Sequence, residues 1–307
     1  MMNDLIELLG YIVLVLLVTN LKSFIVRKTK SKIISADNFI HVEKILEQIG
    51  LNDNEKVENV LVILDVDETM ITMKDKFLRP SAYIYNEDMY DKIFFPLTDP
   101  DKCLKYSHFI TQAETDVVHE RVPTVIKNLQ NRQIKVLGLT SMIPGAGKCG
   151  IIKSMEDFRR KELLKCGIDL KNEFLPKKIV LDFEKKEGRV PMYKDGIMYA
   201  SPYSKGNVLT EMMLKHMTHL DIKKIYFVDD YDKQIKDIFN TCHKLGVECV
   251  CIHYDDKEIN YEKFDINFGM YQFDYFVKNN KWLDDSYYDE YKKTIRTFVV
   301  ESIFKTF

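Results

Sequence analysis

Two aspartates, Asp65 and Asp67, follow directly on the apolar run Val60 to Leu64. Such a run is typical of a strand that is buried on both faces in a parallel sheet. Side chains alternate along a strand, so both carboxylates leave on one side at its carboxyl end, where open α/β sheets bind ligands. Two negative charges this close repel each other unless a cation lies between them or one keeps a proton. The pair therefore indicates metal binding, nucleophilic attack by a carboxylate, or proton transfer.

Three other places along the chain carry polar residues where a strand ends or a helix begins. Thr140 and Ser141 follow a second apolar run, Asp229 and Asp230 follow a third, and Lys205 precedes a helical pattern. Each taken alone is also explained as a turn, cap or solvated residue. In a parallel sheet, however, these strand ends face one crevice. Their convergence would suit a divalent cation with oxygen ligands and a phosphate group held by the hydroxyl and the ammonium.

The elements that must position these residues alternate between strand and helix. The patterns predict strands at 60–64, 134–139, 179–183, 196–200, 223–228 and 247–253, and helices at 37–50, 114–131, 156–167 and 234–245. Alternation of this kind predicts an α/β fold, with a doubly wound parallel sheet and right-handed crossovers. Helix 37–50 is expected to begin after an Asp37 cap and to end at Gly50.

A polar and aromatic insert interrupts this alternation at residues 76–114. It has too few regularly spaced apolar residues to build a core of its own, and we expect it to be a small helical cap over the strand ends. The predicted domains are therefore a core of 33–75 and 115–307 and a cap of 76–114. Within the core, 264–282 is expected to be irregular and 286–307 to be a helix whose apolar face packs inward.

The first 32 residues are predicted to be a targeting segment followed by a basic linker. The apolar run from Leu8 to Val18 has the length of a signal-peptide core. The positive charges follow the run instead of preceding it, which favours an anchor that keeps the globular part in the cytoplasm. We expect a protein that is membrane-associated or secreted through this segment, with its orientation open.

Composition sets limits on the function. The 307 residues include 45 Lys and Arg against 47 Asp and Glu, so no overall positive field favours a nucleic-acid partner. The six cysteines form no CxxC pair, and structural zinc is not expected. We expect mostly buried free thiols. The stretch PGAGKCG, residues 144–150, lacks the first glycine and the Ser or Thr of a phosphate-binding loop and is predicted to be a turn.

Taken together, these motifs resemble those of the haloacid-dehalogenase (HAD) superfamily of phosphotransferases. Asp65-Val66-Asp67-Glu68-Thr69 is similar to its first motif, Thr140 to the second, Lys205 to the third and Asp229-Asp230 to the fourth. The surrounding sequence, including the stretches VLGLTS and IYFVDD, is similar to an uncharacterised HAD-like family, DUF2608.

The resemblance implies a role for each motif residue. Asp65 would be the nucleophile and Asp67 the general acid and then the base. Thr140, Ser141 and Lys205 would contact the phosphate group. The metal, Mg²⁺, would be held by Asp65, Asp229 and Asp230, with a contribution from Asp67.

The expected function is that of a Mg²⁺-dependent phosphomonoester hydrolase with an aspartyl-phosphate intermediate, acting on a small phosphorylated substrate. Asp67 favours a phosphatase or phosphomutase over a dehalogenase, because dehalogenases lack that acid. Two alternatives remain: a phosphotransferase or phosphomutase of the same fold, and a membrane-tethered binding or surface protein without catalysis.

Overall fold

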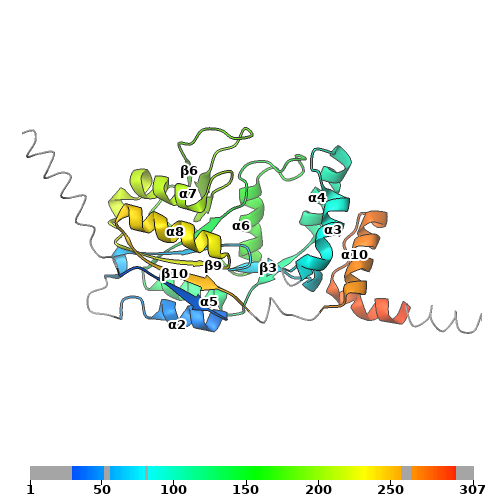
Figure 1. Cartoon of the computed structure of the whole chain (residues 1–307), viewed down its shortest axis with the longest axis horizontal. Coiled ribbons are helices and arrows are strands. Elements are labelled where there is room, and N and C mark those ends of the chain that lie inside the picture. The colour runs from blue at the N-terminus through cyan, green and yellow to red at the C-terminus, as the bar shows by residue number, and fades with distance from the viewer. Residues whose placement is uncertain (1–29, 52–55, 80–81, 257–263, 295–307) are drawn as a thin grey trace, which may run out of the picture.

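A large, mostly parallel sheet forms the centre of the protein. The computed structural model describes residues 30–51, 56–79, 82–256 and 264–294 (Figure 1). The eight strands lie in the order β1-β10-β9-β2-β5-β8-β7-β6. The first six strands in this order are parallel to one another, whereas β7 is antiparallel to both of its neighbours, β8 and β6. Their bounds are β1 Lys32–Ala36, β2 Val60–Leu64, β5 Lys135–Thr140, β6 Lys178–Val180, β7 Met192–Lys194, β8 Ile197–Tyr199, β9 Lys224–Asp229 and β10 Glu248–Tyr254. The predicted α/β class is confirmed.

Strand β2 lies between β9 and β5 and is buried along its whole length. Val60, Val62 and Leu64 pack with the helices of one face, and Leu61 and Ile63 with those of the other. Figure 1 shows α2 (Phe39–Glu47) and α5 (Val122–Asn131) on one side of the sheet, and α7 (Lys205–Glu211) and α8 (Asp232–Leu245) on the other. The unbroken apolar run is therefore explained by two buried faces.

The structure differs from several local predictions. Residues 32–36 form β1 at the sheet edge, and α2 is capped by Asn38 instead of Asp37. The predicted helix 114–131 begins with a strand, β4 (Thr115–Val117), which pairs with β3 (Ile71–Met73) in a separate antiparallel ribbon. β-branched residues on both strands favour this pairing over a helical turn.

Three helices form a second hydrophobic centre beside the sheet, which we call the helical unit: α3 (Tyr83–Phe94), α4 (Pro100–Gln112) and α10 (Ile266–Asn279). The prediction that 264–282 is irregular is wrong, since this stretch contains α10. Its Phe273 and Phe276, with Trp282, complete the apolar cluster around Phe94 and Phe109. The insert alone is indeed too poor in apolar residues, and the C-terminal part of the chain supplies what it lacks.

Predictions for the two ends of the chain fall largely outside the described residues. Residues 1–29 of the predicted targeting segment and linker, 1–32, lie there, as does the last part of the predicted C-terminal helix, 295–307. In the part of the chain that the structure describes, we find no helix with the length and apolar character needed to span a membrane.

A buried carboxylate joins the start of the insert to the segment after α10. Asp75 accepts a hydrogen bond from the indole Nε1 of Trp282 at 2.6 Å and another from the amide of Asp285 at 2.8 Å. Burial raises the pKa of Asp75 to about 6, although both hydrogen bonds oppose the rise. The helical unit therefore depends on a polar contact between residues that are 207 and 210 positions apart.

We expect Asp75→Ala to lower the free energy of unfolding by about 1–3 kcal/mol, because it leaves the buried indole N–H of Trp282 and the half-buried amide of Asp285 without their acceptor. Chemical denaturation would measure the loss, with the exposed Asp274→Ala as the matched control.

The loss should depend on pH. Because the folded pKa of about 6 lies above the unfolded value of 3.8, the group stabilises the fold most below pH 3.8 and loses this contribution as the pH rises through 6. The variant should therefore lose about 1 kcal/mol less at pH 7.5 than at pH 5. An unfolding free energy that is unchanged at both pH values would contradict this role.

Candidate functional site

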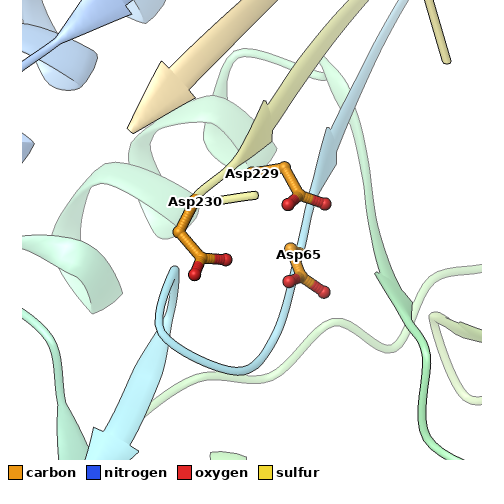
Figure 2. A group of neighbouring side chains, drawn as sticks. All are labelled: Asp65, Asp229 and Asp230. Carbon is orange, nitrogen blue, oxygen red and sulfur yellow. The ribbon is translucent and has the colours of Figure 1, made fainter. Parts of the chain in front are cut away.

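The ends of β2 and β9 bring three aspartates together (Figure 2). Asp65 follows β2, and its amide still donates to the carbonyl of Val228 at 2.8 Å, so the two strands remain paired up to this point. Asp229 is the last residue of β9, and Asp230 follows it. One carboxylate oxygen of each lies within 4.8 Å of the others. We call Asp65, Asp229 and Asp230 the carboxylate cluster.

Lys205 lies between two members of this cluster. It is the first residue of α7, whose start is capped by Ser204, and its side chain is almost completely buried. Its Nζ lies 2.6 Å from Asp65 Oδ1 and 2.6 Å from Asp229 Oδ2. Burial disfavours the ammonium form, but the two carboxylates outweigh that effect and the pKa of Lys205 is raised. The lysine is therefore held charged inside the protein by two acids.

If all three carboxyl groups of the cluster were ionised, their charge would exceed what Lys205 can balance. Burial raises the pKa of Asp65 well above its ordinary value, and Lys205 opposes the rise while Asp229 adds to it. Burial likewise raises the pKa of Asp229, and it raises that of Asp230 to about 6 with a further contribution from Asp229. Ionisation of all three groups is thus unfavourable without a further cation, and the three carboxylates are candidate ligands for one.

Asp67 is held apart from the carboxylate cluster by other contacts. Its Oδ1 accepts a 2.6 Å hydrogen bond from Nη2 of Arg159, and its Oδ2 accepts one from Thr140 Oγ1 at 3.2 Å. Arg159 is buried in α6 (Met155–Lys165), and its Nη1 lies 2.9 Å from Glu162 Oε2. The side chain of Asp67 stays 48% exposed, so it is fixed in orientation but open to an incoming molecule.

The predicted site residues are therefore brought together in two groups. Asp65, Asp229, Asp230 and Lys205 form one, and Thr140 is joined to Asp67 in the other. Ser141 is exposed and lies at the wall of a cavity beside Asp67. Its carbonyl accepts a 2.6 Å hydrogen bond from Ser201 Oγ.

Sequence reasoning missed Arg159, Glu162 and Glu68. On α6, Glu156, Arg159 and Glu162 recur every three residues and are buried, as is Leu163, so charged residues occupy the inward face of this helix. That spacing was the signal available in the sequence. Glu68 accepts a 2.6 Å hydrogen bond from Thr72 Oγ1, and its burial raises its pKa to about 7.

Two neighbouring cavities open at Asp67. The larger one, which we call the main cavity, has a volume of about 440 Å³ and lies between α4 and the loop that follows β5. The second has a volume of about 230 Å³ and is lined by Glu68, Arg159 and Glu162 among others. Both include Asp67, Tyr106 and Ile110, so the helical unit forms one side of each.

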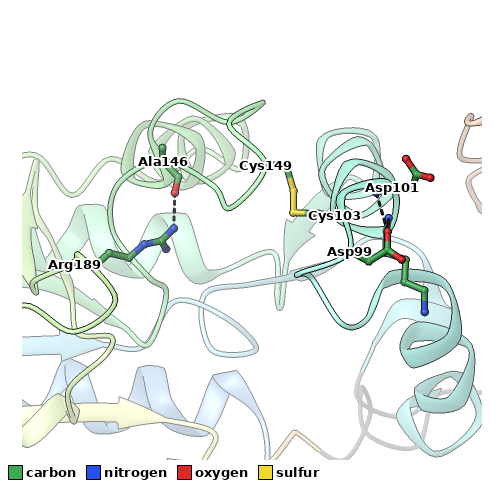
Figure 3. The surroundings of a disulfide bond; sticks show 7 residues. Asp99, Asp101, Cys103, Ala146, Cys149 and Arg189 are labelled. Carbon is green, nitrogen blue, oxygen red and sulfur yellow. Dashed lines mark hydrogen bonds between the residues drawn. A yellow bond between two sulfur atoms is a disulfide. The ribbon is translucent and has the colours of Figure 1, made fainter.

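A disulfide joins the two sides of the main cavity. Cys103 in α4 is bonded to Cys149 in the loop after β5, as Figure 3 shows. The expectation of free thiols is therefore wrong for these two residues and holds for Cys166, Cys242, Cys249 and Cys251. The partners are 46 residues apart, and no local spacing rule pairs cysteines at such a separation.

We expect reduction of this bond, or Cys103→Ser, to lower the free energy of unfolding by about 2–4 kcal/mol, because the bond closes a long loop in the unfolded chain. Thiol titration of the denatured protein should find four free thiols before reduction and six after it. Cys166→Ser, at a half-buried free thiol, is the control and should leave the effect of reduction unchanged. Six reactive thiols in the protein before any reductant is added would refute the pairing.

Comparison with known proteins identifies the family of this chain. A model of the family described as "Protein of unknown function (DUF2608)" matches residues 38–288, which include the carboxylate cluster, Lys205 and both cysteines of the disulfide. An uncharacterized protein of Rickettsia prowazekii (strain Madrid E) is 22% identical over 232 residues, which cover 74% of this chain and 81% of that protein. No solved structure is significantly similar. The chain belongs to the DUF2608 family.

Proposed function

We propose that the protein is a Mg²⁺-dependent phosphomonoester hydrolase that uses the chemistry of the HAD superfamily. The observation that carries the proposal is the convergence of Asp65 and Asp229, at the carboxyl ends of adjacent parallel strands, on Lys205, whose Nζ lies 2.6 Å from a carboxylate oxygen of each. Thr140 ends the neighbouring strand β5, and its hydroxyl donates to Asp67, which follows β2. In the HAD resemblance, Asp65 is the nucleophile, Asp229 a metal ligand and Lys205 the phosphate-binding lysine. Thr140 supplies the phosphate-binding hydroxyl, and Asp67 is the general acid.

The donor atoms fit a hard divalent cation. The carboxylate cluster offers only carboxylate oxygens, which Mg²⁺ prefers, and its members would be the ligands. Two net negative charges remain when the ammonium of Lys205 is set against the three carboxylates, and a divalent cation would balance them. When bound, the cation would neutralise part of the charge of a phosphate group and favour the ionised form of Asp65.

In the first step, the Asp65 carboxylate attacks the phosphorus of the ester. A carboxylate–phosphorus bond forms and the bond to the leaving oxygen breaks. Asp67 donates its proton to that oxygen, so the alcohol departs neutral. Lys205 and the Thr140 hydroxyl are in reach to stabilise the negative charge on the transferring group. The products of this step are the free alcohol and Asp65 as an acyl phosphate.

In the second step, water replaces Asp65 on phosphorus. Asp67, now a carboxylate, removes a proton from the attacking water, and the phosphorus–Asp65 bond breaks. Inorganic phosphate leaves and both aspartates return to their starting states. The helical unit would act as the cap, because its helix α4 lines the main cavity that opens at Asp67.

The proposal is tested by phosphate release from a panel of phosphomonoesters with Mg²⁺ and with EDTA. We expect activity that needs the metal and falls about a thousandfold or more in Asp65→Asn, whose amide cannot attack phosphorus. Asp182→Asn, at a highly exposed side chain, should leave the rate unchanged. If Asp65→Asn kept most of its activity, the nucleophile would be wrong. If the folded protein released no phosphate from any ester, the hydrolase would be excluded in favour of a phosphotransferase or a binding protein.

Arg159 is expected to position Asp67, since it holds one carboxylate oxygen at 2.6 Å from a buried site on α6. Arg159→Ala should lower kcat about ten- to hundredfold with little change in KM, because the acid loses its alignment. The loss should be larger for phenyl phosphate than for nitrophenyl phosphate, whose leaving group needs less protonation. Arg159→Lys should restore part of the rate.

The control for this prediction is Arg160→Ala, at the next residue of α6, whose guanidinium is paired with Asp169 and Asp195 instead. It should not change how the rate depends on the leaving group. Equal losses for both esters in Arg159→Ala would show a structural role alone.

A further inference from the structure

The main cavity suggests what kind of substrate the site takes. We infer that the leaving group is an apolar, ring-sized body that carries a second negative charge, an inference that rests on the proposed function. Asp67 and Ser141 line the cavity at one side, so a leaving group whose oxygen meets Asp67 would extend into this space. A volume of about 440 Å³ is within the range of small-molecule sites.

The walls of the main cavity are mostly apolar. Ile110 and Tyr106 contribute from α4, and Met142, Ile143 and Ile152 from the loop after β5. Burial of a ligand's apolar surface against such walls stabilises the complex, whereas a hydrated polyol offers little apolar surface to bury. A small polar alcohol such as glycerol would leave most of this surface in contact with water. The walls therefore favour an aromatic or alicyclic leaving group.

Two cationic side chains add a second requirement. Lys148 and Arg189 line the main cavity, whereas Asp67 is the one acid among the described residues that line it. Arg189 is anchored by a 2.8 Å hydrogen bond from its Nη2 to the carbonyl of Ala146, and Lys148 is exposed at the cavity (Figure 3 shows the anchored arginine). A second anionic group on the substrate would be attracted to these cations.

The lining of the neighbouring cavity carries the opposite charge. It is lined by Asp67, Glu68 and Glu162 against Arg159 alone among the described cations there. An anionic ester would be repelled from this acidic space and directed into the main cavity. The Cys103–Cys149 bond, whose Cys149 also lines the main cavity, fixes the distance between α4 and the loop and limits the size of the body that fits.

The test compares three phosphate esters with the full chain in its oxidised form: a naphthyl phosphate carrying a carboxylate on its far ring, the same ester carrying a methyl group there, and glycerol phosphate. We expect kcat/KM for the methyl ester to exceed that for glycerol phosphate about tenfold or more. The carboxylate should raise it by about a further two- to fivefold. Glycerol phosphate as the best substrate, or a carboxylate that lowers kcat/KM, would overturn the inference.

Two variants, each with a control, separate the requirement for an apolar leaving group from the requirement for a negative charge. Lys148→Ala should reduce the advantage of the carboxylate, because Arg189 is then the one cation left among the described residues of the lining, while Lys153→Ala, at an exposed lysine outside the lining, should leave that advantage unchanged. Ile110→Asn should reduce the preference for naphthyl esters, while Leu104→Asn, at an exposed residue of the same helix, should not. A carboxylate advantage that is undiminished in Lys148→Ala would overturn the charged requirement.

Binding distinguishes failure of this inference from failure of the proposed function. If none of the esters is hydrolysed, the proposed function fails, and titration of the Asp65→Asn protein with the naphthyl carboxylate ester decides the rest. Saturable binding that weakens in Lys148→Ala would support a site for an anionic aromatic ligand. Binding that does not saturate, or that is the same in both proteins, would overturn it.

Discussion

Two buried carboxylates, Asp65 and Asp229, share a single ammonium group beside the half-buried Asp230, and the surrounding structure holds them in that unfavourable position. Asp65 and Asp229 follow strands that are buried on both faces, so neither can turn toward bulk water without breaking the pairing of β2 with β9. Lys205 is fixed from a third direction by the start of α7. The packing of the two apolar layers thus keeps these like charges close together despite their repulsion. Functional sites commonly hold ionisable groups in this way.

The sequence predicts this part of the molecule well because the signal is local. A strand that is apolar at every position and then ends in acids is visible in ten residues, and the carboxyl ends of neighbouring parallel strands must meet. For this reason the order of residues along the chain is enough to group Asp65, Asp229, Asp230 and Lys205. The pairing of Thr140 with Asp67 follows from the same geometry, since β2 and β5 are neighbours.

The helical unit, the disulfide and the residues that orient Asp67 could not be predicted, because they depend on contacts between distant segments. Nothing near Trp282 indicates that its indole bonds Asp75, and nothing near Cys103 indicates Cys149. Residues 264–282 look irregular by themselves, because the partners that make α10 a core helix lie in the insert. Arg159 occupies a helix rich in charges, where one buried arginine is hard to tell from its exposed neighbours. The strand ends were predictable, and the groups that orient Asp67 and form the helical unit were not.

The bond between Cys103 and Cys149 has a practical consequence for anyone who prepares this protein. The sheet and the carboxylate cluster contain no disulfide in the described part of the chain, whereas one wall of the main cavity is tied by one. Material made in a thiol-reducing cytosol and material made in an oxidising compartment would share a core but differ in the freedom of α4. Protein with the disulfide and protein without it should be treated as two different samples. The redox conditions of preparation should be recorded with every measurement.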